Sequence, residues 1–137
     1  MLSLASERAV VLFSKIRVLV VDYDPLMRTF VTNMLARIGI HQVQQAADGK
    51  AALVALIKFQ PNLVLSDIHM EPMSGIELVK QLRALPNPAV AATRVIMMTA
   101  DSSKETLSEA LPLGIRGYII KPPTMDAMKT RIEAAMK

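Results

Sequence analysis

The chain has 137 residues, of which 52% are hydrophobic and 20% are charged, and it carries a formal net charge of +4 without any cysteine. This length suits one domain with a substantial core, and the composition excludes extended disorder. The lack of cysteine excludes disulfides and thiolate chemistry. Lysine and arginine are spread along the chain without a dense run, which favours a solvated surface over a nucleic-acid footprint.

The beginning of the chain shows no targeting signal. Its longest uncharged apolar piece, residues 9–13, is far shorter than a membrane span, and no small-residue cleavage site follows it. We therefore expect a cytoplasmic protein without membrane contact.

Residues 1–15 precede the first strong pattern, and we expect them to form an extension with a weak helical rhythm. A β-branched run at 17–21 predicts the first strand. Asp24 and Pro25 indicate the start of a helix, because the carboxylate can cap free amides while proline suits the first helical position. This helix is expected to end near Ile38, before a glycine. The residues expected on its buried face are Leu26, Phe30, Met34, Leu35 and Ile38.

Weak alternation at 41–46 predicts the second and poorest strand, which should lie at an edge of the sheet. A helix over 49–59 follows, and Leu53, Leu56 and Ile57 are expected on its inner side. In the stretch 62–70, apolar residues run without alternation before Asp67, which predicts a strand buried on both faces. After a loop at 69–75, a third helix is expected from about Gly75 to Leu85, with Ile76, Val79 and Leu82 buried.

Prolines end the third helix, and we expect residues 87–93 to form a connector. The fourth strand is predicted at 94–98, and a short helix at 103–111 should be stopped early by Pro112. Residues 117–120 predict the fifth strand, and Thr124 should cap the last helix. The residues expected on the inner side of that helix are Met125, Met128, Ile132 and Ala135.

Strand and helix alternate five times between residues 16 and 137, which predicts an α/β domain with a parallel sheet and helices on both faces. Right-handed crossovers favour a flavodoxin-like, doubly wound sheet of five strands in the order 2-1-3-4-5, with five helices on its two faces. This order places the first and third strands side by side at the topological switch point, so their ends should share one crevice.

Polar side chains follow or end four of the predicted strands. Asp22 ends the first, Asp67 the third, Thr99 the fourth and Lys121 the fifth. Neighbouring carboxylates repel each other unless a cation lies between them, and Mg²⁺ suits oxygen ligands and water. A lysine and a hydroxyl beside them suit phosphoryl transfer, in which positioning and charge neutralisation supply most of the catalysis. No glycine-rich nucleotide loop is present, so an aspartyl phosphate on Asp67 is the simplest hypothesis.

Four motifs at successive strand ends carry a family resemblance. They are Leu-Val-Val-Asp at 19–22, Asp67-x-x-Met70-x-x-Met73-x-Gly75, Thr99-Ala100, and Gly117-Tyr118-Ile119-Ile120-Lys121-Pro122. In this order and spacing, the sequence resembles the receiver domain of bacterial two-component response regulators, of the single-domain kind, from about residue 16 to residue 137.

The resemblance implies that Asp67 accepts a phosphoryl group from a phosphohistidine on a sensor histidine kinase or a phosphotransfer protein. It implies that Asp22, Asp67 and the backbone carbonyl of His69 hold Mg²⁺, and that Lys121 pairs with the phosphate. The protein would then be a phosphoacceptor with at most slow self-dephosphorylation, and not an enzyme with a substrate of its own.

The resemblance also implies a switch. Thr99 would move toward the new phosphate and Tyr118 would change rotamer, and the surface of the last two strands and helices would then bind a downstream protein target. The peptide bond between Lys121 and Pro122 would be cis.

Two positions depart from the family pattern. The family usually has two adjacent acids after the first strand, but the second position here is Tyr23, whose neutral phenol is a poor Mg²⁺ ligand. Asp24 is not expected to replace it, because Asp24 caps the helix. We therefore expect weaker Mg²⁺ binding than is usual. In the loop, Glu71 stands where the family favours proline and Pro72 follows it, so we expect an altered turn and an intact site.

Some of these residues have simpler interpretations. A lone threonine or lysine at a strand end is ordinary, and Tyr118 alone would be a packed aromatic with a hydrated hydroxyl. His69 could instead be a transition-metal ligand, although a single histidine in a loop is more often only solvent-exposed. Asp101 could order water near the phosphate, or it could be an exposed loop acid.

The alternative function is that of a degenerate receiver, a phosphorylation-independent protein-interaction module. This alternative is suggested by Tyr23, which stands in place of the usual second acid. An aspartyl-nucleophile phosphatase would need a second acid two residues after the nucleophile, where His69 stands. Direct nucleic-acid binding is not expected, because too few residues remain outside the core for a helix-turn-helix domain.

Overall fold

A computed structural model describes residues 11–100 and 103–137. The strands are β1 (Arg17–Val21), β2 (Gln42–Ala46), β3 (Leu63–Asp67), β4 (Arg94–Thr99) and β5 (Gly117–Ile120). The α-helices are α2 (Pro25–Ile38), α3 (Gly49–Lys58), α4 (Gly75–Arg83), α5 (Pro88–Ala91), α6 (Lys104–Ala110) and α7 (Met125–Met136). Short 3₁₀ helices, η1 (Phe13–Lys15) and η2 (Leu111–Leu113), precede β1 and follow α6. None of the helices in these ranges is long and apolar enough to cross a membrane.

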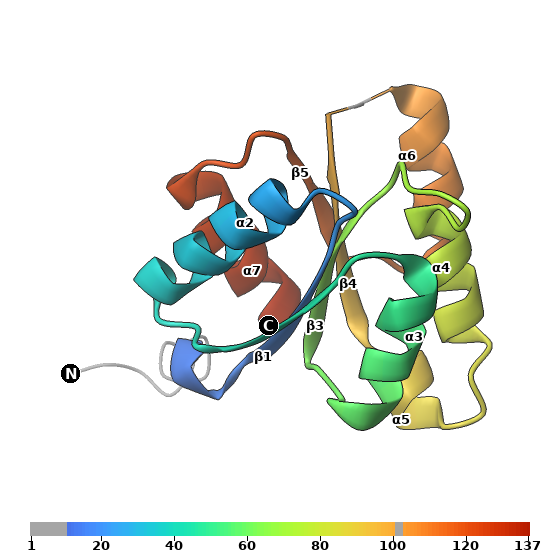
Figure 1. Ribbon diagram of the computed structural model, residues 1–137, viewed down its shortest axis with the longest axis horizontal. Helices are drawn as coiled ribbons and strands as arrows, with labels where there is room; N and C mark the ends of the chain where they lie inside the picture. The colour runs from blue at the N-terminus through green and yellow to red at the C-terminus, as the bar shows by residue number, and fades with distance from the viewer. Residues whose placement is uncertain (1–10, 101–102) are drawn as a thin grey trace.

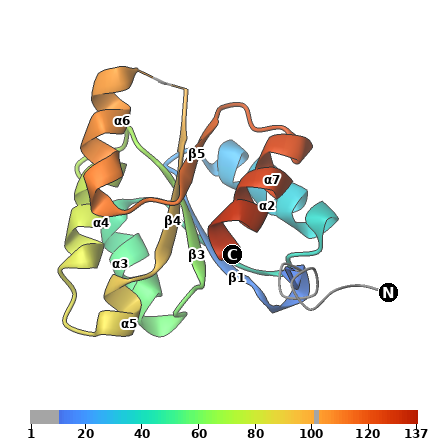
Figure 2. The ribbon, with the colours of Figure 1, turned by 180° about the vertical axis from the view of Figure 1, so that it is seen from behind.

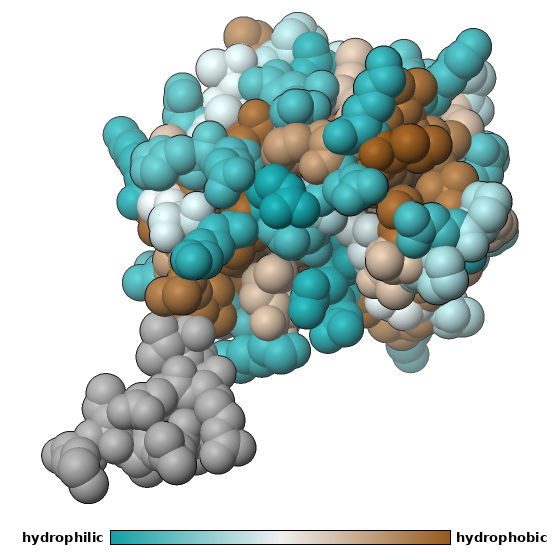
Figure 3. Space-filling model, turned by 90° about the horizontal axis from the view of Figure 1, so that it is seen from below, coloured by the Kyte–Doolittle hydropathy of each residue, from teal (hydrophilic) through white to brown (hydrophobic). Residues whose placement is uncertain are grey.

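The five strands form one parallel sheet in the order β2-β1-β3-β4-β5. Helices α2 and α7 cover one face, and α3, α4 and α6 cover the other (Figures 1 and 2). The predicted flavodoxin-like, doubly wound architecture is confirmed, and β2 lies at an edge as expected. All strands run in one direction, so they begin at one edge of the sheet, which Figure 3 views from below, and end at the opposite edge.

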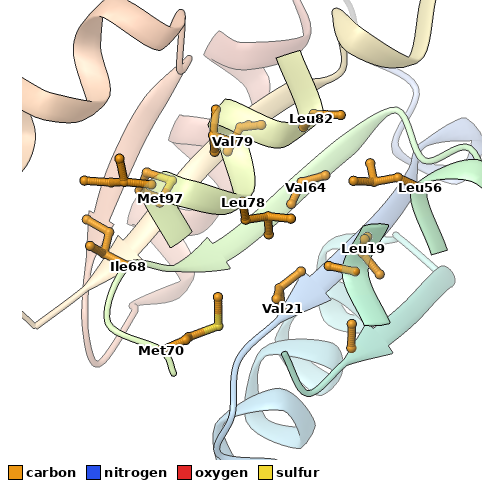
Figure 4. Packing of buried hydrophobic residues seen from close by; sticks show 14 of the residues in the cluster. Leu19, Val21, Leu56, Val64, Ile68, Met70, Leu78, Val79, Leu82 and Met97 are labelled. Atoms are coloured by element: carbon orange, nitrogen blue, oxygen red, sulfur yellow. The ribbon is translucent and has the colours of Figure 1, made fainter. Parts of the chain in front are cut away.

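Two hydrophobic clusters fill the space between the sheet and its two helix layers. Alternate residues of one strand enter different clusters: Leu19 and Val21 pack under α3 and α4 (Figure 4), whereas Val18 and Val20 pack under α2 and α7. Side chains of a strand point alternately to its two faces. Where helices cover both faces, the residues that point to either face must therefore be apolar. This explains why the central strands are continuous apolar runs.

The predicted capping residues begin their helices. The Asp24 side chain accepts a hydrogen bond from the backbone N–H of Leu26 at the start of α2, and Thr124 accepts one from Ala127 at the start of α7. Gly39 ends α2 in the left-handed conformation with φ of 108°. The helix starts that position the site are therefore fixed by local chemistry.

The buried face of α2 differs from the prediction. Leu26 and Phe30 are 79% and 46% exposed, and Val31 is buried together with Met34 and Leu35. The predicted stripe used residues four apart, and each such step rotates about 40° around a helix of 3.6 residues per turn. Two other residues that were predicted to be buried are exposed. Ile57 is exposed beside buried Leu56 in α3, and Met125 is exposed in the first turn of α7.

The predicted connector at 87–93 contains a short helix, α5. The Asn87 carboxamide oxygen accepts hydrogen bonds from the backbone N–H groups of Ala89 and Val90, and Pro88 occupies the first helical position. This cap chemistry was present in the sequence, and it makes six α-helices over the described ranges instead of the predicted five. The predicted early stop before Pro112 is confirmed, because α6 ends at Ala110.

Gly75 joins the end of β3 to the start of α4 at close range. Its backbone N–H donates a hydrogen bond of 2.7 Å to the carbonyl of Ile68. A Cβ atom at this position would collide with the backbone carbonyl of Asp67 and would lie 2.9 Å from the Cα atom of Ile68. Glycine is therefore required here by the approach of α4 to the strand that carries Asp67.

We predict that Gly75→Ala lowers the free energy of unfolding by roughly 1–3 kcal/mol, because the clash with backbone forces α4 away from β3. Urea denaturation followed by circular dichroism measures this change. Gly49→Ala is the comparison, since a methyl group there meets the flexible side chain of Met73. A loss at Gly75 no larger than that at Gly49 contradicts the assigned constraint.

Candidate carboxylate and lysine site

The four polar residues predicted to share an edge do so. Asp22 directly follows β1, Asp67 is the last residue of β3, Thr99 is the last residue of β4, and Lys121 directly follows β5. In the register of the sheet, Asp67 lies opposite Met98 and Thr99 lies opposite Ile120. The site therefore lies at the edge where the strands end, at the upper side of the molecule in Figure 1.

The carboxylate of Asp22 is fully buried and is held at both oxygens. Its Oδ1 atom accepts a hydrogen bond of 2.9 Å from the backbone N–H of Asp24, and its Oδ2 atom accepts one of 2.5 Å from Lys121 Nζ. Its backbone carbonyl accepts a hydrogen bond of 2.6 Å from Arg28 in α2. These contacts fix the loop between β1 and α2 around the carboxylate.

The ammonium group of Lys121 contacts two carboxylates. Its Nζ atom lies 2.5 Å from Asp22 Oδ2 and 3.2 Å from Asp67 Oδ2. The Lys121 side chain is 14% exposed, and the backbone N–H of Lys121 donates to the carbonyl of Thr99. The peptide bond between Lys121 and Pro122 is cis, as the resemblance implied. One lysine thus contacts two buried acids from neighbouring strands, and its single positive charge offsets only part of their combined negative charge when both are ionised.

Burial and the neighbouring charges act on the pKa values of this group. Burial raises the pKa of Asp67 above its usual value, the charge of Lys121 lowers it and that of Asp22 raises it, and the net direction is upward. Burial lowers the pKa of Lys121, but the hydrogen bond to Asp22 and the charge of Asp67 outweigh this effect and place it above the usual value. Lys121 is therefore charged at neutral pH, and the Asp67 carboxylate is held in a poorly solvating environment.

Thr99 and His69 take the places that the sequence predicts for them. Thr99 is fully buried at the end of β4, and His69 lies in the exposed loop after β3. A hydrogen bond from the His69 backbone is one of the effects that lower the pKa of Asp67, against the larger effect of burial. The predicted role of Asp101 concerns a residue outside the described part of the chain.

Tyr118 lies on β5 on the side of α6, away from the carboxylates, where its half-buried ring packs against the cluster under α3 and α4. The guanidinium carbon of Arg131 in α7 lies 5.8 Å from the centre of this ring, a cation–π contact. Arg131 was not predicted from the sequence, because nothing in its spacing relates it to Tyr118 before the sheet brings α7 beside β5.

Tyr23 is 65% exposed and lines two hollows. One, of about 430 Å³, is also lined by Asp22, Asp67 and Lys121, and the other, of about 420 Å³, extends over His69 and Glu71. The tyrosine thus lies at the mouth of the site. In the neighbouring loop, the peptide bond between Glu71 and Pro72 is cis.

The oxygen donors at this edge suit a hard divalent cation. Two carboxylates, Asp22 and Asp67, meet at one ammonium group beside an open hollow, and the backbone carbonyl of His69 follows in the same loop. Mg²⁺ commonly takes one or two carboxylates and keeps several waters, so this donor set fits it. Within residues 11–100 and 103–137, no three histidine, aspartate or glutamate side chains form a metal-binding group. Asp24 caps α2, as predicted, and its Oδ1 atom accepts from Leu26.

Asp67→Asn is predicted to raise the free energy of unfolding at pH 7 in the absence of divalent cations. An acid whose folded pKa is raised contributes most to stability below its unfolded pKa, near about 4, and this contribution is lost as the pH rises through the folded pKa. The gain from the substitution should therefore shrink as the pH falls toward about 4.

Urea unfolding between pH 4 and pH 8 in the presence of EDTA measures this difference. Glu109→Gln removes an exposed acid from α6 and is the control for a general change in net charge. A loss of stability at pH 7 on Asp67→Asn would show that the pairing of Asp67 with Lys121 outweighs the cost of burial.

Comparisons with known proteins agree with this architecture and site. A family profile described as the response regulator receiver domain matches residues 18–133. The chain is 35% identical over 123 residues to the chemotaxis protein CheY-3 of Vibrio cholerae, covering 90% of this chain and 93% of that protein. It is 33% identical over 120 residues to a probable chemotaxis protein CheY of Rhizobium etli, covering 88% and 92%.

The structure also resembles solved receivers. It matches the chemotaxis protein CheY4 of Vibrio cholerae with a TM-score of 0.80 and 29% sequence identity, over 88% of this chain and 98% of the other. The family profile covers nearly the whole described domain, and the relatives align along almost their full length. The chain belongs to the response regulator receiver domain family of two-component signalling.

Proposed function

We propose that this chain is a phosphorylation-controlled switch in which Asp67 accepts a phosphoryl group from a sensor histidine kinase or a histidine phosphotransfer protein. The observation that supports this proposal best is the contact of one ammonium group, on Lys121, with the carboxylates of Asp22 and Asp67 beside an open hollow. A lysine placed there can stabilise the negative charge of a phosphoryl group as it arrives.

The proposed transfer forms a bond between an Asp67 carboxylate oxygen and phosphorus and breaks the bond between phosphorus and the donor imidazole nitrogen, which leaves and takes up a proton. Receiver domains generally bind Mg²⁺ at this site. Here Asp22, Asp67 and the His69 backbone carbonyl would hold the ion, which would neutralise phosphoryl charge when bound. Lys121 would exchange its contact with Asp67 for one with the phosphoryl oxygens while keeping Asp22.

The exposed face of α2 supports docking of a protein donor. Leu26 and Phe30, about one turn apart on α2, are exposed, and Tyr23, three residues before Leu26, lies at the mouth of the carboxylate hollow. Exposed apolar side chains that lie close together commonly mark protein contacts. We infer that the phosphohistidine-bearing partner packs against this face.

We further propose that the signal leaves through Thr99 and Tyr118. Thr99 ends β4 directly beside β5, and Tyr118 lies on β5 with Arg131 against its ring. A phosphoryl group that attracts the Thr99 hydroxyl would allow the Tyr118 ring to move, and Arg131 would have to leave the ring or follow it. The surface of β5, α6 and α7 would then bind a downstream protein.

The proposed context is a cytoplasmic two-component pathway. Because the relatives from Vibrio cholerae and Rhizobium etli are named chemotaxis proteins, we propose chemotaxis signalling as the process. In this proposal residues 16–137 form the receiver domain, residues 1–15 form an extension, and the protein is a phosphoacceptor with at most slow self-dephosphorylation.

The phosphoacceptor role predicts that the full chain gains one phosphoryl group when it is incubated with acetyl phosphate and Mg²⁺. Mass spectrometry of the intact protein measures this gain, and Asp67→Asn should abolish it. An unmodified mass after prolonged incubation, with a known receiver modified in parallel, would favour the alternative function, a phosphorylation-independent interaction module.

Weak metal binding is the expected consequence of Tyr23. Replacing the exposed phenol by a carboxylate in Tyr23→Asp adds a hard oxygen ligand and a negative charge at the mouth of the site. We expect Mg²⁺ to bind the variant at least about tenfold more tightly than the parent, as measured by calorimetry. Tyr23→Phe is the matched control and should bind Mg²⁺ as the parent does. Equal affinity in the parent and in Tyr23→Asp would refute the assigned role of this position.

A further inference from the structure

Arg28, in the first turn of α2, donates two side-chain hydrogen bonds to groups outside its helix. Its Nη1 atom donates to the backbone carbonyl of Asp22 at 2.6 Å, and its Nε atom donates to Oε1 of Gln45 at 3.1 Å. Asp22 directly follows β1, so the first bond joins α2 to the strand end that carries the buried carboxylate. This guanidinium group has no part in the phosphoryl transfer proposed above.

Gln45, on the edge strand β2, holds this arginine in place. It lies opposite Val20 in the sheet register, and Val20 packs under α2 and α7, so the Gln45 side chain points to the α2 side of the sheet. Its Oε1 atom accepts from Arg28, and its Nε2 atom donates to Thr32 Oγ1 at 3.1 Å. Arg28 and Thr32 are neighbours on one face of α2, so a single carboxamide fixes the direction of the guanidinium group.

The bond from Arg28 sets the peptide plane that follows Asp22. A peptide unit is planar, so fixing its carbonyl also fixes its N–H group and the direction in which the chain continues. On the other side, the N–H of Asp22 donates to the carbonyl of Ala46 at 3.1 Å. Both peptides of Asp22 are thus held, which keeps its carboxylate directed toward the N–H of Asp24 and toward Lys121.

We propose that Arg28 is a positioning residue for the carboxylate site: through the Asp22 carbonyl, it holds the Asp22 carboxylate in the direction in which it can share Mg²⁺ with Asp67. Groups that orient metal ligands without touching the metal commonly change metal affinity about 10- to 100-fold when they are removed. This inference rests on the proposed function, because the ion concerned is the Mg²⁺ of the phosphoryl-transfer site.

The charge of Arg28 alone predicts the opposite result. A guanidinium group beside Asp22 repels a divalent cation, so its removal would tighten Mg²⁺ binding if charge were its only contribution. Removal of a positioning group instead weakens binding, because the Asp22 carboxylate then takes up orientations that do not serve the ion. The sign of the change in affinity therefore separates the two roles.

Calorimetric titration of the full chain with Mg²⁺ tests the proposal, both in the parent and in the Tyr23→Asp background, where tighter binding is expected. Arg28→Met keeps an apolar stem but removes the donors and the charge, and it should raise the Kd about tenfold. Arg28→Lys keeps the charge and a donor, and it should bind Mg²⁺ more tightly than Arg28→Met. Gln45→Ala leaves every charge unchanged and should weaken binding by a smaller factor.

Two exposed positions supply matched controls. Arg37→Met removes the same charge from the last turn of α2, and Gln44→Ala removes a carboxamide from the same strand as Gln45. Neither should raise the Kd. An unchanged or lower Kd in Arg28→Met would overturn the proposal, and so would an equal rise in Arg37→Met.

Hydrogen exchange in the metal-free protein gives a second measurement. The Asp24 amide donates to the Asp22 carboxylate, so its protection should fall in Arg28→Met by a larger factor than that of Leu65 in the central strand β3, which reports global stability. Equal losses at the two amides would show a general loss of stability and would overturn the positioning role.

Acetyl phosphate separates a failure of this inference from a failure of the proposed function. If the parent is not phosphorylated at Asp67, the proposed function fails, whereas the Mg²⁺ affinities of the variants still decide the role of Arg28. If the parent is phosphorylated and Arg28→Met has the Kd of the parent, only the role of Arg28 is overturned. Absence of Mg²⁺ binding in both backgrounds would overturn the inference together with the proposed metal site.

Discussion

The contact of Lys121 with Asp22 and Asp67 is the interaction on which the site depends. Asp22 is fully buried, and an isolated carboxylate in that position would be strongly destabilising, so the ammonium group must come from a strand end two places along the sheet from β3. The parallel sheet in this order brings the three strand ends together. The polar contact thus requires the fold, and the fold places the Asp67 carboxylate next to the ammonium group.

The architecture could be predicted because local signals agreed with one another. Continuous apolar runs marked the central strands, and Asp24 and Thr124 marked helix starts by cap chemistry that depends on a few neighbouring residues. The faces of the helices were harder, as Leu26 and Phe30 show, because a stripe of apolar residues does not distinguish a face turned to the sheet from one turned to a partner. Asn87 capped a helix too short to produce a periodic pattern.

For the site, the sequence could predict which residues stand at the strand ends, but not the contacts between their side chains. The parallel sheet places Asp22, Asp67 and Lys121 at one edge, and the motif spacing identified the same residues. The division of one ammonium group between two acids, and the cation–π contact of Arg131, could not be predicted, because they depend on side-chain distances between segments far apart in the chain.

The positions of the two tyrosines have a practical consequence. The chain contains no tryptophan, so its intrinsic ultraviolet fluorescence comes from Tyr23 and Tyr118. One ring is exposed at the mouth of the carboxylate hollow, and the other is half-buried on β5 under a guanidinium group. The protein therefore carries a natural optical reporter at the entrance of its candidate phosphorylation site and a second one on its candidate output strand. Single phenylalanine replacements would separate the two emissions.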